Sequence, residues 1–326
     1  MRVLVTGASG FLGGWVAQIL SERGHTVRAL VRKTSKRAHL EKLANLEFAE
    51  GSVEDREAVG RAMEGVDAVV HSAGLVKARS EAEFYATNVQ GTQNLVDAAK
   101  ALSSLERFVH VSSLEATGPS RDGSPVPTAQ AAPVTAYGRS KLESEKVVLA
   151  AAEAFKVTVL RPTAIYGPRD QEILEAFKSV KRGLMPTVSG GKTLGCFIYA
   201  ADCAEACAAA IEKDHPSGSI FHIVDNFGAV SQKQFLELVE SALGKKALIR
   251  MSLPRGLLKT VSYGVKAFGQ VTGRAVMLTP EKADMLLQHF VATSEEAQKA
   301  LGWRPRVGLD EGVKLTVQWY RENGWL

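Results

Sequence analysis

A tyrosine and a lysine stand four residues apart in the stretch "TAYGRSKLESEK", which covers residues 135–146. If this stretch is a helix, Tyr137 and Lys141 share one face. Free tyrosine has a pKa of about 10, but a lysine ammonium about 4 Å away contributes roughly 4 kcal/mol, enough to lower that pKa by up to about three units. We therefore predict that Lys141 acidifies Tyr137, which then acts as a general acid/base near neutral pH.

Two serines can assist this pair. The stretch "VHVSSLEATG" is typical of a strand that ends at Ser112 and Ser113. A serine hydroxyl at the end of a strand can orient a substrate oxygen beside the tyrosine. Each of these residues alone has an ordinary explanation as a polar side chain, but the combination favours a catalytic site formed by Ser113, Tyr137 and Lys141.

A glycine-rich loop, "VTGASGFLGG", follows the first apolar run. Gly7, Gly10 and Gly13 are three residues apart, between an expected strand and an expected helix. Such glycines permit a tight turn, close approach of the backbone to a pyrophosphate, and close helix–strand packing, while the helix N-terminus faces the phosphates. The triplet alone is a weak signal, because glycine-rich turns contain it too and its spacing differs from G-x-G-x-x-G. Its position favours a dinucleotide-binding loop.

The end of the expected second strand, "LVRKTSKR", bears on the choice of cofactor. A carboxylate at this place would bind the ribose hydroxyls of NAD, but Val31 has none. Arg32 follows, with Lys33, Lys36 and Arg37 nearby, and cations suit a 2′-phosphate. The sequence therefore favours NADP(H), with Arg32 as the leading contact. NAD(H) stays open, because a solvated basic loop is common.

Strand and helix patterns alternate through the first half of the chain. The expected strands are residues 2–7, 25–32, 46–51, 66–74, 105–113 and 156–162, and the expected helices are residues 11–24, 35–45, 55–65, 81–102 and 136–155. Residues 196–213 and 218–225 are expected to return to the same sheet. This alternation predicts an α/β fold, a Rossmann-type doubly wound parallel sheet with a smaller, mostly helical C-terminal substrate lobe. The dinucleotide-binding domain would comprise residues 1–165 and about 196–226, and the lobe about 166–195 and 227–326.

Composition excludes several other classes of protein. The 326 residues carry a net charge of +5 without a long basic block, so we expect a small-molecule substrate and no nucleic acid. Cys203 and Cys207 lie in an apolar helical run, and no histidine or further cysteine completes a zinc set, so no metal is expected. No apolar run approaches the roughly 20 residues that span a bilayer, and the chain enters a strand at once. These features predict a cytoplasmic protein without a transmembrane segment.

Several stretches together resemble the extended short-chain dehydrogenases/reductases, the NAD(P)-dependent epimerase/dehydratase family. They are "TGASGFLG", "DAVVHSAG", "NVQGTQNL", "VHVSSLEATG", "YGRSK", "LRPTAIYGP" and the terminal "ALGWRPRVGLDEGVKLTVQWY". The resemblance covers nearly the whole chain and is closest to the branch of 3β-hydroxysteroid dehydrogenases and dihydroflavonol reductases. It implies an NAD(P)-dependent enzyme and a homodimer that pairs the helices near 81–102 and 136–155.

The resemblance also assigns roles to residues. Tyr137 would be the proton donor and acceptor, Lys141 its helper and Ser113 the residue that orients the hydroxyl. The expected cofactor contacts are Gly7, Ser9, Gly10, Phe11, Leu12, Gly13, Arg32, Ser52, Val53, Ser72, Ala73, Gly74, Asn88, Ser112, Tyr137, Lys141, Arg161, Pro162 and Thr163.

Departures from the family pattern bear on the substrate. Ser52 stands where relatives have an acid near adenine, and Thr117 where many sugar epimerases have tyrosine. Gly195 and Cys196 replace the arginine and aspartate of a pyrophosphate-binding segment. We therefore favour hydride transfer between nicotinamide and a ketone or secondary alcohol of an apolar substrate. The alternatives are a sugar-nucleotide epimerase or dehydratase with tightly held NAD, and a non-catalytic NADP-sensing protein.

Residues 254–274 have apolar side chains at helical spacing, together with four basic residues and no acid. The simplest interpretation is a lid helix packed on the lobe. The segment could also line an apolar substrate or touch an anionic membrane surface.

Overall fold

The computed structural model describes all 326 residues and is built around a seven-stranded sheet with the strand order β11-β6-β5-β4-β1-β2-β3. Every neighbouring pair is parallel. After β1 the chain adds strands first on one side and then on the other, so the sheet is doubly wound, as predicted. The strands are β1 (Arg2–Thr6), β2 (Thr26–Val31), β3 (Leu46–Glu50), β4 (Ala68–His71), β5 (Arg107–Val111), β6 (Lys156–Pro162) and β11 (Ser219–Ile223).

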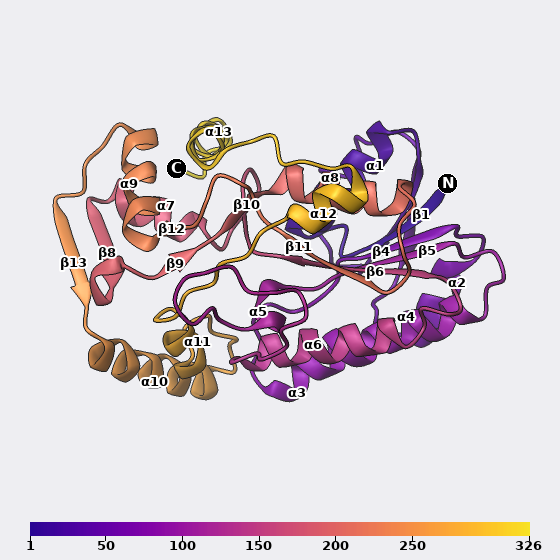
Figure 1. Cartoon of the computed structure of the whole chain (residues 1–326), viewed down its shortest axis with the longest axis horizontal. Helices are drawn as coiled ribbons and strands as arrows, with labels where there is room; N and C mark the ends of the chain where they lie inside the picture. Colours follow the sequence, from indigo (N-terminus) through magenta and orange to yellow (C-terminus); the bar gives the residue numbers. More distant parts are fainter.

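Helices cover both faces of this sheet (Figure 1). Alternate residues of a strand point to opposite faces. Val3 and Val5 of β1 therefore join one apolar cluster and Leu4 joins the other. The first cluster includes α1 (Phe11–Glu22), α8 (Ala200–Glu212) and α12 (Glu295–Leu301), and the second includes α2 (Arg56–Met63), α4 (Gly91–Lys100) and α6 (Ala136–Leu149). Helix α12 packs on the sheet although the sequence assigned its residues to the lobe. The other domain boundaries stay a prediction.

The helix expected at 81–102 is continuous but not uniform. It starts as α3 (Glu81–Phe84), passes through a π-helical turn, η1 (Tyr85–Gln90), and continues as α4 to Lys100. The wider turn contains Asn88, whose side chain is buried. Single π-turns inside helices often accompany functional sites. Here the turn directs an amide toward the loop that follows β4.

Two predictions about secondary structure were wrong. Residues 35–45 form turns instead of a helix, because Leu40 is buried against the first apolar cluster and tertiary packing overrides local propensity. The run 196–213 was expected to return to the main sheet. Its strand β10 (Phe197–Tyr199) instead pairs with β7 (Ala164–Tyr166) in a separate two-stranded sheet, while α8 covers the main sheet.

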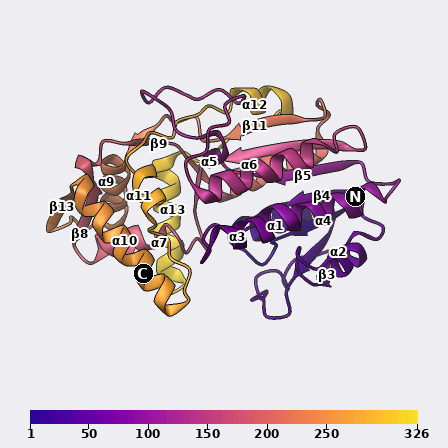
Figure 2. The same ribbon diagram turned by 90° about the horizontal axis from the view of Figure 1, so that it is seen from below.

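The smaller lobe lies at one end of the sheet (Figures 1 and 2). Its own apolar core contains Tyr166, Phe177, Phe235 and Tyr320. None of its helices combines the length and apolar character needed to cross a bilayer. Its further elements are α7 (Leu174–Lys181), β8 (Leu184–Val188), η2 (Ser189–Gly191), β9 (Leu194–Gly195), β12 (Val230–Ser231), α9 (Gln232–Leu243), β13 (Ile249–Leu253), α10 (Arg255–Thr272), α11 (Pro280–Met285) and α13 (Leu309–Glu322).

Candidate active site

A large pocket of about 1690 Å³ lies between the carboxyl ends of the strands and the lobe. Most of the predicted cofactor contacts line it. These are Gly7, Ser9, Gly10, Phe11, Leu12, Gly13, Arg32, Ser52, Val53, Ser72, Ala73, Gly74, Ser112, Tyr137, Lys141, Pro162 and Thr163. Typical sites for small ligands have volumes of roughly 300–1000 Å³. This pocket therefore has room for a dinucleotide together with a substrate.

The glycine loop has the geometry that a pyrophosphate requires. Gly7 has a positive φ of 70°, which favours glycine. A Cβ on Gly13 would lie 2.2 Å from the carbonyl oxygen of Gly7, so α1 packs against the loop only because this residue has no side chain. Gly10 caps α1 without any side-chain hydrogen bond. The first N–H groups of the helix are therefore available to an anion.

At the adenosine end, the basic residues after β2 separate into two groups. Arg32, Ser35 and Lys36 line the pocket. Arg37 is turned away, because its guanidinium stacks on Phe48 at 4.8 Å and lies 3.5 Å from a carboxylate oxygen of Glu41. Sequence reasoning named Arg32 and Lys36 among these basic residues but missed Ser35.

The loop after β4 is held in place by Asn88. Its amide oxygen accepts a hydrogen bond from the Leu75 N–H at 2.8 Å, and its NH₂ donates to the Leu75 carbonyl at 3.1 Å and to Ser140 Oγ at 2.9 Å. Asn88 is buried and does not line the pocket. Its two N–H groups are used, while its amide oxygen accepts one hydrogen bond and can accept another, so a direct cofactor contact of Asn88 stays a prediction. Within the fold it positions the loop that contains Ser72, Ala73 and Gly74.

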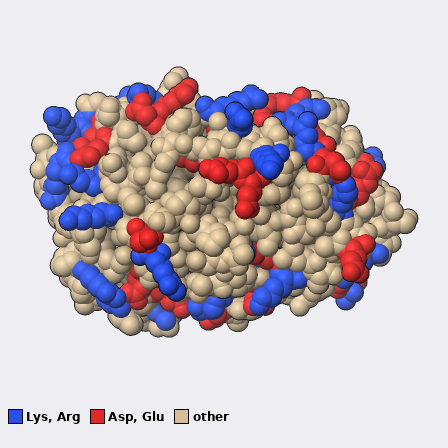
Figure 3. All heavy atoms as spheres, in the orientation of Figure 1, with Lys and Arg blue, Asp and Glu red and all other residues tan.

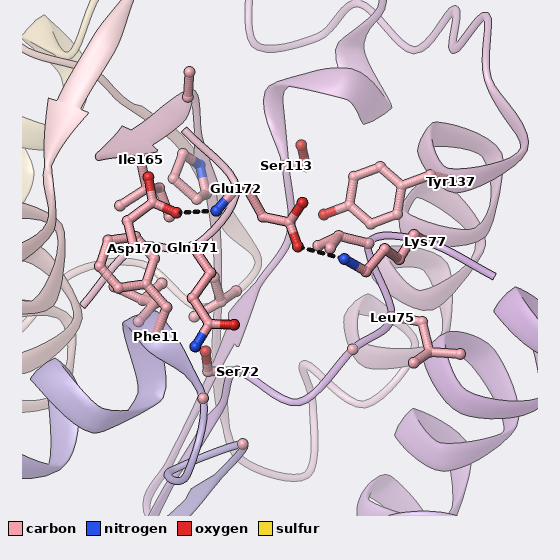
Figure 4. Close-up of a pocket in the computed structure, with 18 of the residues that line it drawn as sticks. Phe11, Ser72, Leu75, Lys77, Ser113, Tyr137, Ile165, Asp170, Gln171 and Glu172 are labelled. Carbon is pink, nitrogen blue, oxygen red and sulfur yellow. Dashed lines mark hydrogen bonds and ion pairs between the residues drawn. The ribbon is translucent and has the colours of Figure 1, made fainter. Parts of the chain in front are cut away.

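The three predicted catalytic residues do meet in the pocket. Thr135 caps α6 by accepting a hydrogen bond from the Gly138 N–H at 2.9 Å, which fixes the start of the helix that carries Tyr137 and Lys141. Ser113 follows β5 and lines the pocket beside the Tyr137 hydroxyl (Figure 4). Figure 4 shows that hydroxyl pointing into the pocket on the side of Ser113. The buried Lys141 ammonium donates to the Val111 carbonyl at 2.7 Å.

The predicted acidification of Tyr137 is wrong for this structure. Burial raises the pKa of the Tyr137 hydroxyl, the Glu115 carboxylate raises it further, and only the neighbouring Ser113 hydroxyl lowers it. Burial also lowers the pKa of Lys141 to about 8, while Glu145 opposes that shift. The sequence shows the spacing of the pair but neither the desolvation nor the carbonyl that Lys141 binds.

The side chain of Arg161 does not line the pocket, and a cofactor contact from this residue stays a prediction. Its guanidinium is buried and donates to both carboxylate oxygens of Glu145, at 2.9 and 2.7 Å, and to Thr117 Oγ1 at 3.1 Å. Glu145 also accepts a hydrogen bond from Ser112. This ion pair ties β6 to α6 and fixes the strand end that presents Ser113. Thr117, which replaces the tyrosine of many epimerases, is itself fully buried.

Two charged residues beside Tyr137 were missed. Glu115 lies two residues after Ser113 and accepts hydrogen bonds from Thr135 Oγ1 at 2.7 Å and from the Lys282 ammonium. Lys282 of α11 also lies 5.5 Å from the centre of the Tyr137 ring. The sequence could have indicated a role for Glu115, because this acid follows the two serines directly in "SSLEATG". Nothing in the sequence connects Lys282 to a site 145 residues away.

A further ion pair crosses the mouth of the pocket. The Lys77 ammonium, in the loop after β4, donates to a carboxylate oxygen of Glu172 at 2.8 Å (Figure 4). Glu172 lies in the loop between β7 and α7. Asp170 fixes this loop by accepting hydrogen bonds from the backbone N–H groups of Glu172 and Ile173. The two sides of the pocket are therefore joined at the surface by one pair of half-exposed side chains.

Comparison with known proteins identifies the family. The model of the NAD dependent epimerase/dehydratase family matches residues 3–223. The chain belongs to this family. It is an enzyme of the extended short-chain dehydrogenase/reductase type, as predicted, whereas the finer branch stays a prediction.

Relatives in this family differ in what they act on. A ceramide reductase of Caulobacter vibrioides is 31% identical, with 99% of this chain and 96% of the relative covered. A 4-hydroxy-2-methyl-3-oxo-4-farnesyl-3,4-dihydroquinoline-1-oxide ketoreductase of Stigmatella aurantiaca is 29% identical, with 98% and 96% covered. The solved structure of the dTDP-glucose 4,6-dehydratase DesIV from Streptomyces venezuelae, which contains NAD, is 26% identical with a TM-score of 0.82 and covers 100% and 98%.

Proposed function

We propose that this enzyme transfers a hydride between a nicotinamide cofactor and the ketone or secondary alcohol of an apolar substrate. The observation that carries the proposal is the lining of the substrate half of the pocket. Apolar side chains of the lobe and its connections line the same pocket as Ser113 and Tyr137, namely Ile165, Leu194, Phe197, Phe235, Met285, Leu286, Phe290, Trp319 and Trp325. Such a lining favours an apolar substrate over a charged one.

Cations that could bind a sugar-nucleotide pyrophosphate are scarce in this half of the pocket. Arg169 and Lys282 line it, but both are engaged. Arg169 stacks on Trp15 at 4.1 Å, and Lys282 pairs with Glu115. Gly195 and Cys196 line the pocket without any charge. The names of the ceramide reductase and the farnesyl-quinoline ketoreductase are in keeping with a substrate that has an apolar chain.

The residues present fit a proton-transfer role at the substrate oxygen. In reduction, the Tyr137 hydroxyl donates its proton to the carbonyl oxygen, and the Ser113 hydroxyl donates a second hydrogen bond to the same oxygen. Lys141, which lines the same pocket, would hold a hydroxyl of the cofactor's ribose. In oxidation, the Tyr137 oxygen accepts the proton of the substrate hydroxyl, and Ser113 forms a hydrogen bond with the same substrate oxygen. The nicotinamide, when bound, supplies or accepts the hydride.

The adenosine end of the pocket supports NADP(H) as the preferred cofactor. Arg32 is exposed and lines the pocket, and no hydrogen bond or ion pair within the chain engages its side chain. Strand β2 ends at Val31, so no carboxylate stands where a ribose 2′-hydroxyl would be bound. Arg32, with Ser35 and Lys36, would hold a 2′-phosphate in the arrangement that guanidinium and phosphate prefer.

Titration of the purified protein with NADPH and NADH tests this assignment. We expect tighter binding of NADPH, and a loss of about tenfold in NADPH affinity alone for Arg32→Ala, since one charge-assisted contact contributes about 1.5 kcal/mol. Arg37→Ala is the matched control, because Arg37 lies outside the pocket. Tightly retained NAD⁺ after purification, or equal losses for both cofactors, would contradict the proposal and favour an epimerase or dehydratase.

A panel of apolar ketones, incubated with NADPH, tests the substrate class. We expect Tyr137→Phe to lower kcat/KM at least about 100-fold, because a general acid contributes roughly 10²–10⁴. Tyr263→Phe, on the exposed surface of α10, is the control and should leave kcat/KM unchanged. Full turnover by the Tyr137 variant would exclude the assigned role.

A further inference from the structure

Exposed apolar side chains are concentrated in residues 248–286. Ten of the fifteen large apolar residues that reach solvent lie there, within β13, α10, α11 and their connections. Contiguous exposed apolar surface on a folded protein usually marks an interaction site. We call this region the 248–286 surface. Its members are Leu248, Ile249, Met251, Leu257, Val261, Tyr263, Phe268, Val271, Met277 and Leu286.

The same region is basic, since residues 248–286 contain six lysines and arginines and two acids, Glu281 and Asp284. No aspartate or glutamate occurs from Ser241 to Pro280, whereas seven lysines and arginines do, although the whole chain carries a net charge of only +5. Figure 3 shows Lys and Arg gathered at the end of the molecule that β13 and α10 occupy in Figure 1. Lys266 and Arg274 have no acidic partner within the chain, and Lys259 pairs only with Asp284, at 2.9 Å.

Helix α10 separates its apolar and basic residues. Leu258, Ser262 and Gly269 are buried against the lobe. A second apolar stripe faces solvent and consists of Leu257, Val261, Phe268 and Val271, which share one helix face because they are spaced by four, seven and three residues. Lys266 falls on the opposite side of the helix at 100° per residue. Apolar and basic faces on one exposed helix are typical of helices that lie in a membrane interface.

We propose that the 248–286 surface docks on an anionic lipid bilayer. The stripe on α10 enters the acyl boundary, and the basic residues lie among the headgroups. A second copy of the chain is a poorer occupant, because a two-fold contact sets the same patch against itself and brings two surfaces of net positive charge together. The lipid is therefore the partner that satisfies both the apolar stripe and the unpaired cations.

The 248–286 surface adjoins the pocket, so docking on a membrane would place the pocket next to the lipid. Met277 and Leu286 belong to the 248–286 surface and also line the pocket. An apolar substrate dissolved in the bilayer would therefore meet the rim of the pocket directly. The docking itself rests on exposure and charge, and it does not depend on which reaction the enzyme performs.

Co-sedimentation of the full chain with vesicles tests the proposal without a substrate. We expect binding to phosphatidylcholine vesicles that contain phosphatidylglycerol, weaker binding at high salt, and little binding to phosphatidylcholine alone. Phe268→Asp should weaken partitioning at least about tenfold. Phe227→Asp is the matched control, since Phe227 is 61% exposed and Phe268 59%, but Phe227 lies outside the surface. This control should bind as the unchanged protein does.

A charge reversal completes the test. Lys266→Glu with Arg274→Glu should weaken binding to the anionic vesicles about tenfold or more, because each cation near the membrane contributes about 1 kcal/mol. Lys42→Glu with Lys100→Glu makes the same change in net charge elsewhere and should have little effect. The proposal is overturned if the unchanged protein fails to bind the anionic vesicles, or if both pairs of substitutions act alike. It is also overturned if Phe268→Asp changes only the oligomeric state.

Discussion

Glu115 and Lys282 place opposite charges beside the reacting hydroxyl of Tyr137. The carboxylate raises the pKa of Tyr137, and the ammonium of α11 pairs with that carboxylate. Alcohol oxidation requires Tyr137 to accept a proton, so the balance between these two charges sets the pH at which the site can work in that direction.

Removing the charge of Glu115 tests whether this carboxylate controls the pKa of Tyr137. Glu115→Gln keeps an oxygen that accepts from Thr135 but removes the negative charge, so the pKa of Tyr137 should fall. We expect the pH profile of alcohol oxidation to move to lower pH. Glu143→Gln on the outer face of α6 is the control. A lower rate at every pH, with the profile unmoved, would show that Glu115 has only a structural role.

Residue types and spacing predicted the site better than its electrostatics. Ser113, Tyr137 and Lys141 could be found because strand ends and helix faces bring them together in any doubly wound sheet. The roles of Asn88 and Arg161 could not, because they depend on partners distant in sequence, Leu75 and Glu145. Both side chains form several hydrogen bonds inside the fold.

Among the elements, the loop between β1 and α1 depends on Gly13 more than on any other residue. A Cβ at this position would lie 2.2 Å from the Gly7 carbonyl oxygen and 2.5 Å from its carbon, both backbone atoms that cannot move aside. Gly13→Ala should displace α1, abolish cofactor binding and destabilise the fold by more than about 1 kcal/mol.

Gly60 offers a matched control for this substitution. It lies inside α2, and a Cβ there would meet nothing within 4 Å. Gly60→Ala should stabilise the fold by about 0.5–1 kcal/mol, because alanine loses less conformational entropy in a helix. Denaturant unfolding and cofactor titration of both variants check the prediction. Equal effects at the two positions would show that close packing of the loop is not the constraint.

The parallel sheet and the helices on both of its faces could be predicted from the alternation of apolar runs, although the order of the strands was not predicted. The failures occurred where packing decides between local alternatives. Residues 35–45 contain a helix-like pattern, yet Leu40 is used as a single buried contact. β10 has the apolar character of a core strand, but it pairs with β7 because the chain has already entered the lobe. Neither outcome is encoded in local propensity.

At the scale of the whole molecule, buried neutral histidines make the fold sensitive to acid. Burial lowers the pKa of His71 to about 3 and that of His222 to about 4. The unfolded chain binds these protons near pH 6.5, so their contribution to stability is complete above that pH and is lost as the pH falls toward 4. Asp170 and Asp225, whose pKa values burial raises to about 6, act in the opposite direction below pH 6.

His222→Gln isolates one of these protons. The glutamine can still form a hydrogen bond with Thr117, which His222 meets at 3.0 Å, but it does not titrate. Between pH 7 and pH 5, we expect the free energy of unfolding to decrease less in the variant, by up to about 1.4 kcal/mol per pH unit. Denaturant titrations at several pH values measure this. The same pH dependence in both proteins would mean that His222 is not neutral in the fold.

The pairing of two copies through the helices near 81–102 and 136–155 stays a prediction from the family resemblance. Sedimentation of the intact protein measures it directly. The pocket is completed by the lobe of the same chain, so the proposed chemistry does not require a second copy.

The most direct measurement of the central claim follows the hydride itself. The protein would be incubated with an apolar ketone and NADPH that carries deuterium at the reactive carbon of the nicotinamide, and the products examined by mass spectrometry. We predict one deuterium on the carbinol carbon for each NADPH oxidised, with Tyr137→Phe nearly inactive. A converted substrate without deuterium, together with unchanged nicotinamide, would contradict net hydride transfer to a ketone.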